Sequence, residues 1–150
     1  MKYELTNKTT KHSGITLHRI RALETKGVIK EGKLGGWIEK ESNLSQDGDA
    51  WVSGEAQVYG DAQVFGDAQV FGSAKVFGNA QMFGNAWVSE NAQVFGSAKV
   101  FGDARVFGDV KAYEHAWVFG NAQVSRKAQA FGNSKIYGNA RISEDTQIHE

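Results

Sequence analysis

The chain has 150 residues, the length of one domain with a core of its own. Its 17 basic residues balance its 17 acidic residues, so no excess charge favours binding to nucleic acid or to an anionic membrane. Cysteine is missing, which excludes disulfide bonds and thiolate metal sites and leaves the compartment open. Neither a membrane-spanning apolar run nor the apolar core of a signal peptide is present, so we expect a soluble cytoplasmic protein.

Residues 1–36 differ in pattern from the rest and predict a small β cap. Apolar and polar residues alternate around Tyr3–Leu5 and around Ile15–Leu17, which predicts two short strands joined by a polar turn over Lys8–Gly14. Val28-Ile29, bracketed by glycines, is predicted as a third extended piece. A cap has a physical purpose here, because the end of a solenoid exposes unpaired backbone and apolar core.

Residues 37–49 lead into a regular repeat. Ile38 and Leu44 already stand six residues apart, but Val52 follows Leu44 only after eight. The two extra residues fall around Gln46–Asp49, where Asp-Gly is typical of a tight turn. We therefore expect one bulged corner near the start of the repeat.

From residue 50 onward the chain repeats every six residues. Seventeen apolar residues stand six apart from Val52 to Ile148, and fourteen of the residues two places before them are Ala. The unit reads Ala-x-Val-aromatic-Gly-Asp/Asn, where x is Gln, Lys, Arg or Trp. So strict a period indicates a repeat architecture rather than a globular fold.

The pattern within one hexad decides which side chains point inward. Successive side chains of a strand alternate between faces, so Ala and Val share one face and x shares the other with the aromatic residue. Burying Gln, Lys and Arg without partners costs several kcal/mol each, so Ala and Val must face the core. Gly-Asp or Gly-Asn tolerates the positive φ of a sharp corner. The sequence thus predicts an all-β, three-sided parallel β-helix of about six coils, with eighteen residues per coil.

The hexad resembles the hexapeptide repeat of left-handed parallel β-helices. The lead-in, Gly35–Ile38 and Asn43–Val52, resembles more specifically the YdcK-type hexapeptide-repeat proteins. Length and pattern together predict one structural domain, with the cap over 1–36 and the β-helix over 37–150. The resemblance implies the left-handed coil, which the spacing does not distinguish from a right-handed one. Members are often described as acyltransferases by analogy of fold, which is weak support for an activity.

Eighteen residues per coil stack the outward residues into columns. One column holds Tyr59, Phe77, Phe95, Tyr113, Phe131 and finally His149, and a second holds Phe65, Phe83, Phe101, Phe119 and Tyr137. The third is interrupted by serines: Ser53, Phe71, Ser89, Phe107, Ser125 and Ser143. Stacked rings stabilise neighbouring coils. Two adjacent aromatic faces also predict a surface for association, and we expect homo-oligomers, either trimers, as the resemblance implies, or dimers.

Three tryptophans are further candidates for binding. Trp51, Trp87 and Trp117 occupy outward positions, and exposed Trp is a common anchor at interfaces. Each of them could instead pack over its neighbouring coils, and Trp51 could lie under the cap.

Candidate chemistry is sparse. The four histidines do not pair at metal-ligand spacing, and the corner column Asp67, Asn85, Asp103, Asn121, Asn139 separates its carboxylates, so we expect no metal and no cofactor. His115 replaces a corner Asp/Asn and is a weak candidate for the general base that hexapeptide acyltransferases use. The repeat has no insertion that could shape a pocket around it.

We therefore expect a non-enzymatic binding or scaffold protein that self-associates through its aromatic faces. Another protein is a further candidate partner. Two alternatives remain open. One is an acyltransferase-like enzyme of the hexapeptide-repeat class, and the other is a phage or prophage protein that inhibits or sequesters a host protein. A pocket at His115, formed by an insertion or a subunit interface, would favour the enzyme.

Overall fold

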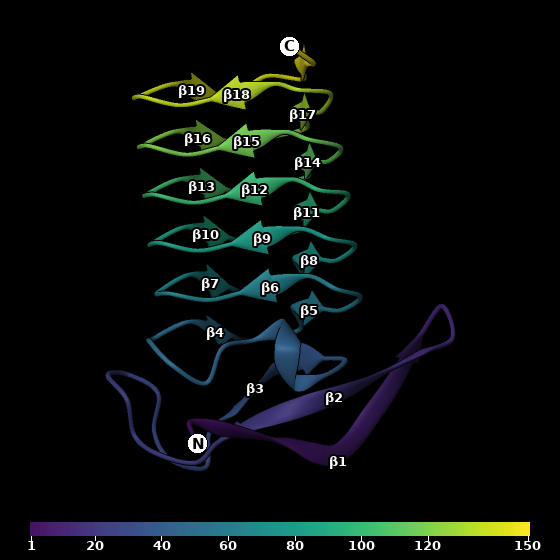
Figure 1. The fold of residues 1–150 in the computed structure, drawn as a ribbon, viewed down its shortest axis with the longest axis vertical. Coiled ribbons are helices and arrows are strands. Elements are labelled where there is room, and N and C mark those ends of the chain that lie inside the picture. Colours follow the sequence, from purple (N-terminus) through teal and green to yellow (C-terminus); the bar gives the residue numbers. More distant parts are fainter.

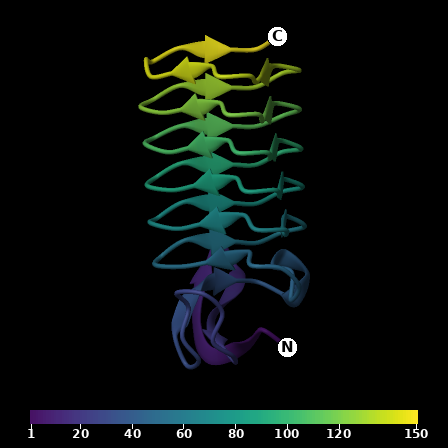
Figure 2. The same cartoon turned by 90° about the vertical axis from the view of Figure 1, so that its left-hand side faces the viewer.

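A computed structural model describes residues 1–150, and strands make up nearly all of its regular structure. From Trp51 onward each hexad contributes one two-residue strand, and the strands wind up a single axis (Figures 1 and 2). They form three parallel sheets, one for each side of the coil. The protein is thus an all-β parallel solenoid of about six turns, as the hexad predicts, with the cap at its N-terminal end.

We number the three faces in chain order. Face 1 is a nine-stranded sheet in the order β1 (Tyr3–His12), β2 (Ile15–Ala22), β3 (Leu34–Ile38), β5 (Gln57–Val58), β8 (Lys75–Val76), β11 (Gln93–Val94), β14 (Lys111–Ala112), β17 (Gln129–Ala130) and β20 (Gln147–Ile148). Face 2 has β6 (Gln63–Val64), β9 (Gln81–Met82), β12 (Lys99–Val100), β15 (Trp117–Val118) and β18 (Lys135–Ile136). Face 3 has β4 (Trp51–Val52), β7 (Gln69–Val70), β10 (Trp87–Val88), β13 (Arg105–Val106), β16 (Gln123–Val124) and β19 (Arg141–Ile142).

The register of the faces places equivalent residues of successive coils beside one another. Lys99 lies beside Trp117 and Val100 beside Val118, and the same relation holds along each face. Backbone hydrogen bonds connect the coils, such as the 2.9 Å bond from the Phe95 N–H to the Ala112 carbonyl. The columns predicted from the sequence therefore exist as rows of neighbouring side chains.

The core is the predicted file of Ala and Val side chains. Ala98 and Val100 have no exposed surface, whereas Lys99 between them reaches solvent. The same alternation holds for nearly every hexad from Ala50 to Ala130, and these residues form one continuous cluster. The inward and outward assignment is confirmed, because the polar residue of each hexad stays hydrated while its neighbours are buried.

The corners use the left-handed backbone conformation that Gly adopts without a steric penalty. Gly102 has a φ of +65°, and the corner glycines above and below it are similar. At three corners another residue adopts this conformation: Glu90 (φ +59°), Glu114 (φ +56°) and Arg126 (φ +63°). A side chain there costs roughly 1–2 kcal/mol of backbone strain, so the repeat tolerates occasional departures from Gly.

The cap is a hairpin that extends face 1. β1 and β2 pair antiparallel, and β3 then pairs antiparallel with β2 and parallel with β5. The polar turn expected over Lys8–Gly14 is much shorter in the structure. β1 continues to His12, and only Ser13-Gly14 turns, with φ of +52° and +82°. The polar character of this stretch misled the prediction, because an edge strand with solvent on both sides needs no apolar alternation.

The prediction of a third extended piece in the cap is also wrong. Val28 is 92% exposed and lies, with Gly27, in a tight turn that brings Lys26 opposite Ile29, so this is no strand. Gly35-Gly36 lies within β3. A Cβ on Gly35 would lie 2.6 Å from the Val52 carbonyl oxygen, so these glycines permit close approach of β3 to the first coil. β3 crosses the boundary between 36 and 37 that we expected between cap and helix.

The lead-in forms the first coil with the expected bulge. A short 3-10 helix, η1 (Glu41–Asn43), precedes Leu44, which pairs with Val64 on face 2. The Asn43 side chain is fully buried and accepts from two backbone N–H groups while its amide donates to two carbonyls. The chain regains its register at Gly48, whose backbone lies over Gly66. The two extra residues are therefore accommodated between Leu44 and Gly48.

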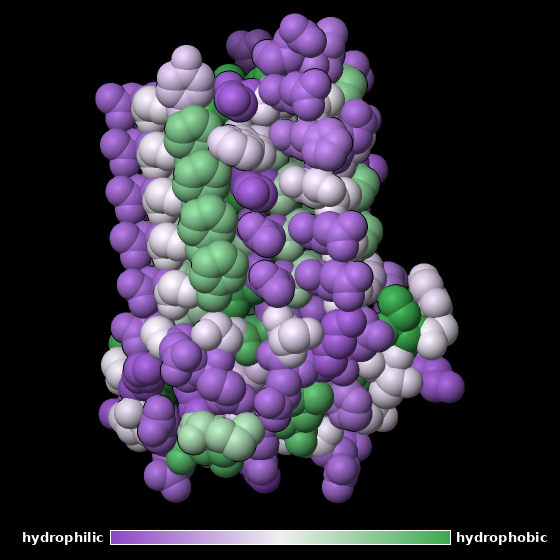
Figure 3. Space-filling view, viewed as in Figure 1, coloured by the Kyte–Doolittle hydropathy of each residue, from purple (hydrophilic) through white to green (hydrophobic).

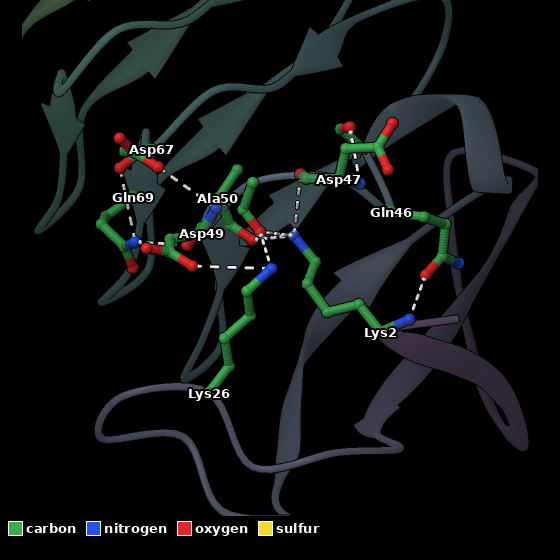
Figure 4. Close-up of polar contacts among 10 residues, drawn as sticks. Lys2, Lys26, Gln46, Asp47, Asp49, Ala50, Asp67 and Gln69 are labelled. Atoms are coloured by element: carbon green, nitrogen blue, oxygen red, sulfur yellow. Dashed lines mark hydrogen bonds and ion pairs between the residues drawn. The ribbon is translucent and has the colours of Figure 1, made fainter.

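The bulged corner forms hydrogen bonds with the N-terminal residues of the chain (Figure 4). The side chain of Gln46 accepts hydrogen bonds from the N–H groups of Lys2 and Tyr3, at 2.8 and 3.2 Å, and donates to the Tyr3 carbonyl. The Lys2 ammonium group donates to the carbonyls of Asp47, Gly48 and Ala50. These bonds fix the start of the hairpin against the first coil.

Candidate functional site

In most hexads an aromatic residue directly follows the two-residue strand and precedes the corner. It is the second outward residue of the hexad, so its ring lies on the outside of the solenoid. Because the same position recurs in each coil, rings of successive coils meet along the axis. We call the resulting rows ladder 1 on face 1 and ladder 2 on face 2.

Ladder 1 contains the residues Tyr59, Phe77, Phe95, Tyr113, Phe131 and His149. Its consecutive ring centroids lie 4.9 to 5.4 Å apart, and all its pairs are stacked. His12 of the hairpin adds an edge-on contact to Tyr59 at 5.4 Å. Ladder 1 is thus covered at its N-terminal end by the cap, and Tyr59 is only 8% exposed.

Ladder 2 contains Phe65, Phe83, Phe101, Phe119 and Tyr137. Its ring centroids lie 4.8 to 5.4 Å apart, with interplanar angles from 0° to 13°. The four Phe rings are half-buried and Tyr137 is 60% exposed. Figure 3 shows this ladder as an unbroken apolar column along the front of the solenoid, with hydrophilic side chains on either side.

Face 3 has no ladder, as the sequence predicts. Serines alternate with Phe71 and Phe107, so the two rings are two coils apart and do not stack. Phe71 instead makes an edge-on contact with Trp87, with centroids 5.8 Å apart. Adjacent aromatic surfaces are therefore confined to faces 1 and 2.

The three candidate tryptophans lie in different environments. Trp51 is 3% exposed and packs edge-on against Tyr3 of the cap, so it offers a partner almost no surface. Trp87 is 40% exposed, and the guanidinium group of Arg105 lies 4.4 Å from its ring centre. The cation–π contact favours packing along face 3, while the exposed part of the ring remains available.

Trp117 sits beside ladder 2 between two lysines. The ammonium groups of Lys99 and Lys135 lie 5.3 and 5.0 Å from its ring centre. Its ring also makes edge-on contacts with Phe101 and Phe119. Trp117 therefore joins the outward row of face 2 to the aromatic ladder.

His115 lies at an exposed corner between faces 1 and 2. The shallow groove beside it is lined by His115, Trp117, Asn133 and Lys135. The imidazole ring makes no hydrogen bond, and the groove offers no carboxylate or hydroxyl to orient it. A general base needs such orientation as well as a bound acceptor, so this geometry does not favour catalysis.

Ion pairs gather at the cap, and no salt bridge joins two residues of the repeat. The four salt bridges join Arg19 to Glu55, Arg21 to Glu4, Lys26 to Asp49 and Lys40 to Asp61. Arg19 also lies over the ring of Trp37 and donates to the carbonyls of Gly35 and Gly54. Its hydrogen bond to Glu55, with a second from the Trp37 indole, lowers the pKa of that exposed carboxyl. From residue 62 onward, the lysines, arginines and carboxylates form no salt bridge within the chain and can meet charges from outside.

The anchoring residues of the cap were missed by sequence reasoning. Lys2, Gln46 and Asn43 look like ordinary surface residues, since no repeat marks them. A signal existed only for Gln46, which lies within the two-residue insertion. Buried polar side chains outside a repeat are found by their partners, and most of those partners lie 17 to 48 residues away.

The geometry defines a class of protein: a three-sided parallel β-solenoid with an N-terminal β cap and aromatic ladders on two faces. Two segments of the chain, residues 56–72 and 134–150, match the model of a family described as YdcK β-solenoid repeat. The match confirms the resemblance seen in the sequence, and the chain is a β-solenoid with YdcK-type repeats. No curated protein matches it. None of its helical structure has the length and apolar character required to cross a membrane.

Proposed function

We propose that the protein is a non-enzymatic binding or scaffold module that self-associates through an aromatic ladder. The observation that carries this proposal is the pair of ladders, in which stacked rings leave a row of edges open to solvent on two faces. Continuous apolar surfaces of this kind usually mark sites of association in soluble proteins. Stacking within one chain satisfies the faces of the rings but leaves their edges for a partner.

The stacking also argues against carbohydrate as the ligand of the ladders. A sugar ring packs on the flat face of an aromatic side chain, and the flat faces here lie against the rings above and below. A second row of apolar side chains, by contrast, can pack along the exposed edges. A protein surface is therefore the partner that the ladders fit best.

Light scattering at tens of micromolar protein tests the proposal. We expect an oligomer for the native chain. Replacing two ring residues by Lys in the ladder that forms the interface should dissociate the oligomer, while the strand content measured by circular dichroism stays unchanged. The two variants are Phe83→Lys with Phe101→Lys on ladder 2 and Phe77→Lys with Phe95→Lys on ladder 1. Ser89→Lys on face 3 is the control and should leave the oligomer intact. A native chain that is monomeric at this concentration rules the proposal out.

A further inference from the structure

Ladders 1 and 2 differ in how accessible they are along the solenoid. Besides His12, the hairpin residue Ile15 packs against the cluster formed by Leu17, Trp37 and Tyr59 at the N-terminal end of face 1, and Phe77 also contacts this cluster. Figure 1 shows the hairpin projecting on the side where β5 lies, whereas β6 to β18 face the viewer without a covering segment. A second molecule can therefore approach ladder 2 along its whole length.

Ladder 2 is flanked by two rows of opposite character. The row two residues before the rings, which we call the basic row, is Gln63, Gln81, Lys99, Trp117 and Lys135. The row two residues after the rings, which we call the acidic row, is Asp67, Asn85, Asp103, Asn121 and Asn139. The ammonium groups of Lys99 and Lys135 lie 5.3 and 5.0 Å from the centre of the Trp117 ring, and Asp103 accepts a hydrogen bond of 3.2 Å from Asn85. No salt bridge within the chain neutralises these charges.

We infer that two copies of the chain meet on face 2 with parallel axes and in register, so that Lys99 of each copy faces Asp103 of the other. This inference rests on the self-association proposed above and assigns it a face, a symmetry and a charge pair.

Symmetry carries the argument. Two faces can pack around a two-fold axis that lies either across the solenoids or along them. An axis across the solenoids makes them antiparallel and sets basic row against basic row and acidic row against acidic row. An axis along ladder 2 exchanges the rows, so each basic row meets the acidic row of the second copy at the same height. Only this parallel arrangement brings opposite charges together.

The pairing at each height is chemically consistent. In register, Lys99 meets Asp103, Lys135 meets the Asn139 amide, and Gln63 meets Asp67. Sliding one copy by a coil sets Lys99 against Asn85 or Asn121 and removes the opposite-charge contact. A shifted pair also has no closed symmetry and would add further copies without end. The in-register dimer both closes and pairs its charges.

Face 1 offers no such match. The same operation on ladder 1 sets Lys75 against Asn79 and Lys111 against His115. Neither pair joins a cation to a carboxylate. Accessibility and charge therefore both select face 2.

Charge reversal tests the pair. Lys99→Asp and Asp103→Lys should each raise the dimer dissociation constant by roughly 10- to 100-fold, because each creates two like-charge contacts. The double variant carrying both changes should recover affinity close to that of the native chain. Lys75→Asp on face 1 is the matched control and should leave the dissociation constant unchanged. A double variant no tighter than either single variant overturns the pair.

Disulfide trapping tests the orientation without background, because the chain has no cysteine. In the parallel dimer each ladder residue lies opposite its own copy, so Phe83→Cys and Phe119→Cys should each form a disulfide-linked homodimer. Mixing the two variants, one with a mass tag, should give no 83–119 cross-link, whereas an antiparallel dimer centred on Phe101 gives that product. A native dimer that breaks with the ladder 1 variant alone, or that cross-links 83 to 119, overturns this inference and leaves self-association standing. A monomeric native chain overturns both.

Discussion

The ammonium group of Lys2 donates a hydrogen bond of 2.7 Å to the backbone carbonyl of Ala50, the first core residue of the regular repeat. Two weaker contacts, to the carbonyls of Gly48 and Asp47, complete the arrangement shown in Figure 4. Only 4% of Lys2 is exposed. A charged group with so little water must be held by its carbonyl partners, so this lysine connects the cap to the coil at an electrostatic cost.

That cost gives the first prediction. Burial, with the nearby charge of Lys26, lowers the pKa of Lys2 from 10.5 to about 8. Between these values the unfolded chain keeps a proton that the folded chain has released, so raising the pH favours the folded state. The free energy of unfolding should therefore increase as the pH rises from about 8 to about 10.5. The increase from Lys2 is at most about 3 kcal/mol, and it is absent below about pH 8.

Urea unfolding of the native chain and of Lys2→Met at several pH values isolates the contribution of Lys2 to the free energy of unfolding. Burial raises the pKa of Tyr3, so deprotonation of this phenol in the unfolded chain lowers stability at the alkaline end. That contribution is common to both proteins and cancels in their difference. The native chain should gain stability relative to Lys2→Met as the pH rises. A difference that is flat across the window contradicts the prediction.

The second prediction concerns the packing of the core. Ala98 has no exposed surface and lies in the continuous core cluster, so Leu there must displace neighbours that have no spare volume. Ala98→Leu should lower the free energy of unfolding by about 1–3 kcal/mol. Gln93 points outward, on the side of the strand that carries the rings. Gln93→Leu should therefore change the free energy of unfolding little. Chemical denaturation measures both, and a larger loss for Gln93→Leu would mean that the two faces are reversed.

The third prediction concerns a flaw in that core. Ser134 takes the place of Ala in its hexad, is fully buried, and its hydroxyl has no hydrogen-bond partner. Ser134→Ala should stabilise the protein by roughly 1–3 kcal/mol, because the unpaired group loses its hydration on folding and gains nothing in return. Ser125→Ala is the control, since that hydroxyl is half-buried and donates to the Ile142 carbonyl. Thermal denaturation should show a gain for Ser134→Ala and none for Ser125→Ala.

The repeat could be predicted from the sequence because one local rule fixes it many times over. The pairing of an Ala with a Val two residues later decides which side faces inward, and the corner Gly decides where the chain bends. The columns of rings follow from the coil length alone. Val110 and Ala112, which exchange the usual sizes of the two inward positions, show that the rule concerns total volume more than identity.

The cap could not be predicted to the same depth, because its structure depends on contacts between distant residues. Thr10 belongs to a long edge strand only because β2 pairs with it, and its own neighbours suggest a loop. The apolar pair Val28-Ile29 reads as a strand but only turns the chain. The accessibility of the ladders also depends on the cap, since only the fold reveals that the hairpin tip reaches Tyr59. Sequence alone therefore gave two equivalent ladders.

The last prediction separates two costs at the corners. A Cβ on Gly102 would lie 2.9 Å from the backbone N of Gly120 in the next coil, so the stacked backbones must shift to admit it. Gly138 has nearly the same φ, +64° against +65°, but nothing lies within 4 Å of its Cβ position. Gly138→Ala should therefore cost only the left-handed backbone conformation, about 1 kcal/mol. Gly102→Ala should cost roughly 1–3 kcal/mol more, because the clash adds to the same strain. Urea unfolding of both variants decides, and equal losses would show that the stacked coils yield to a methyl group at no cost.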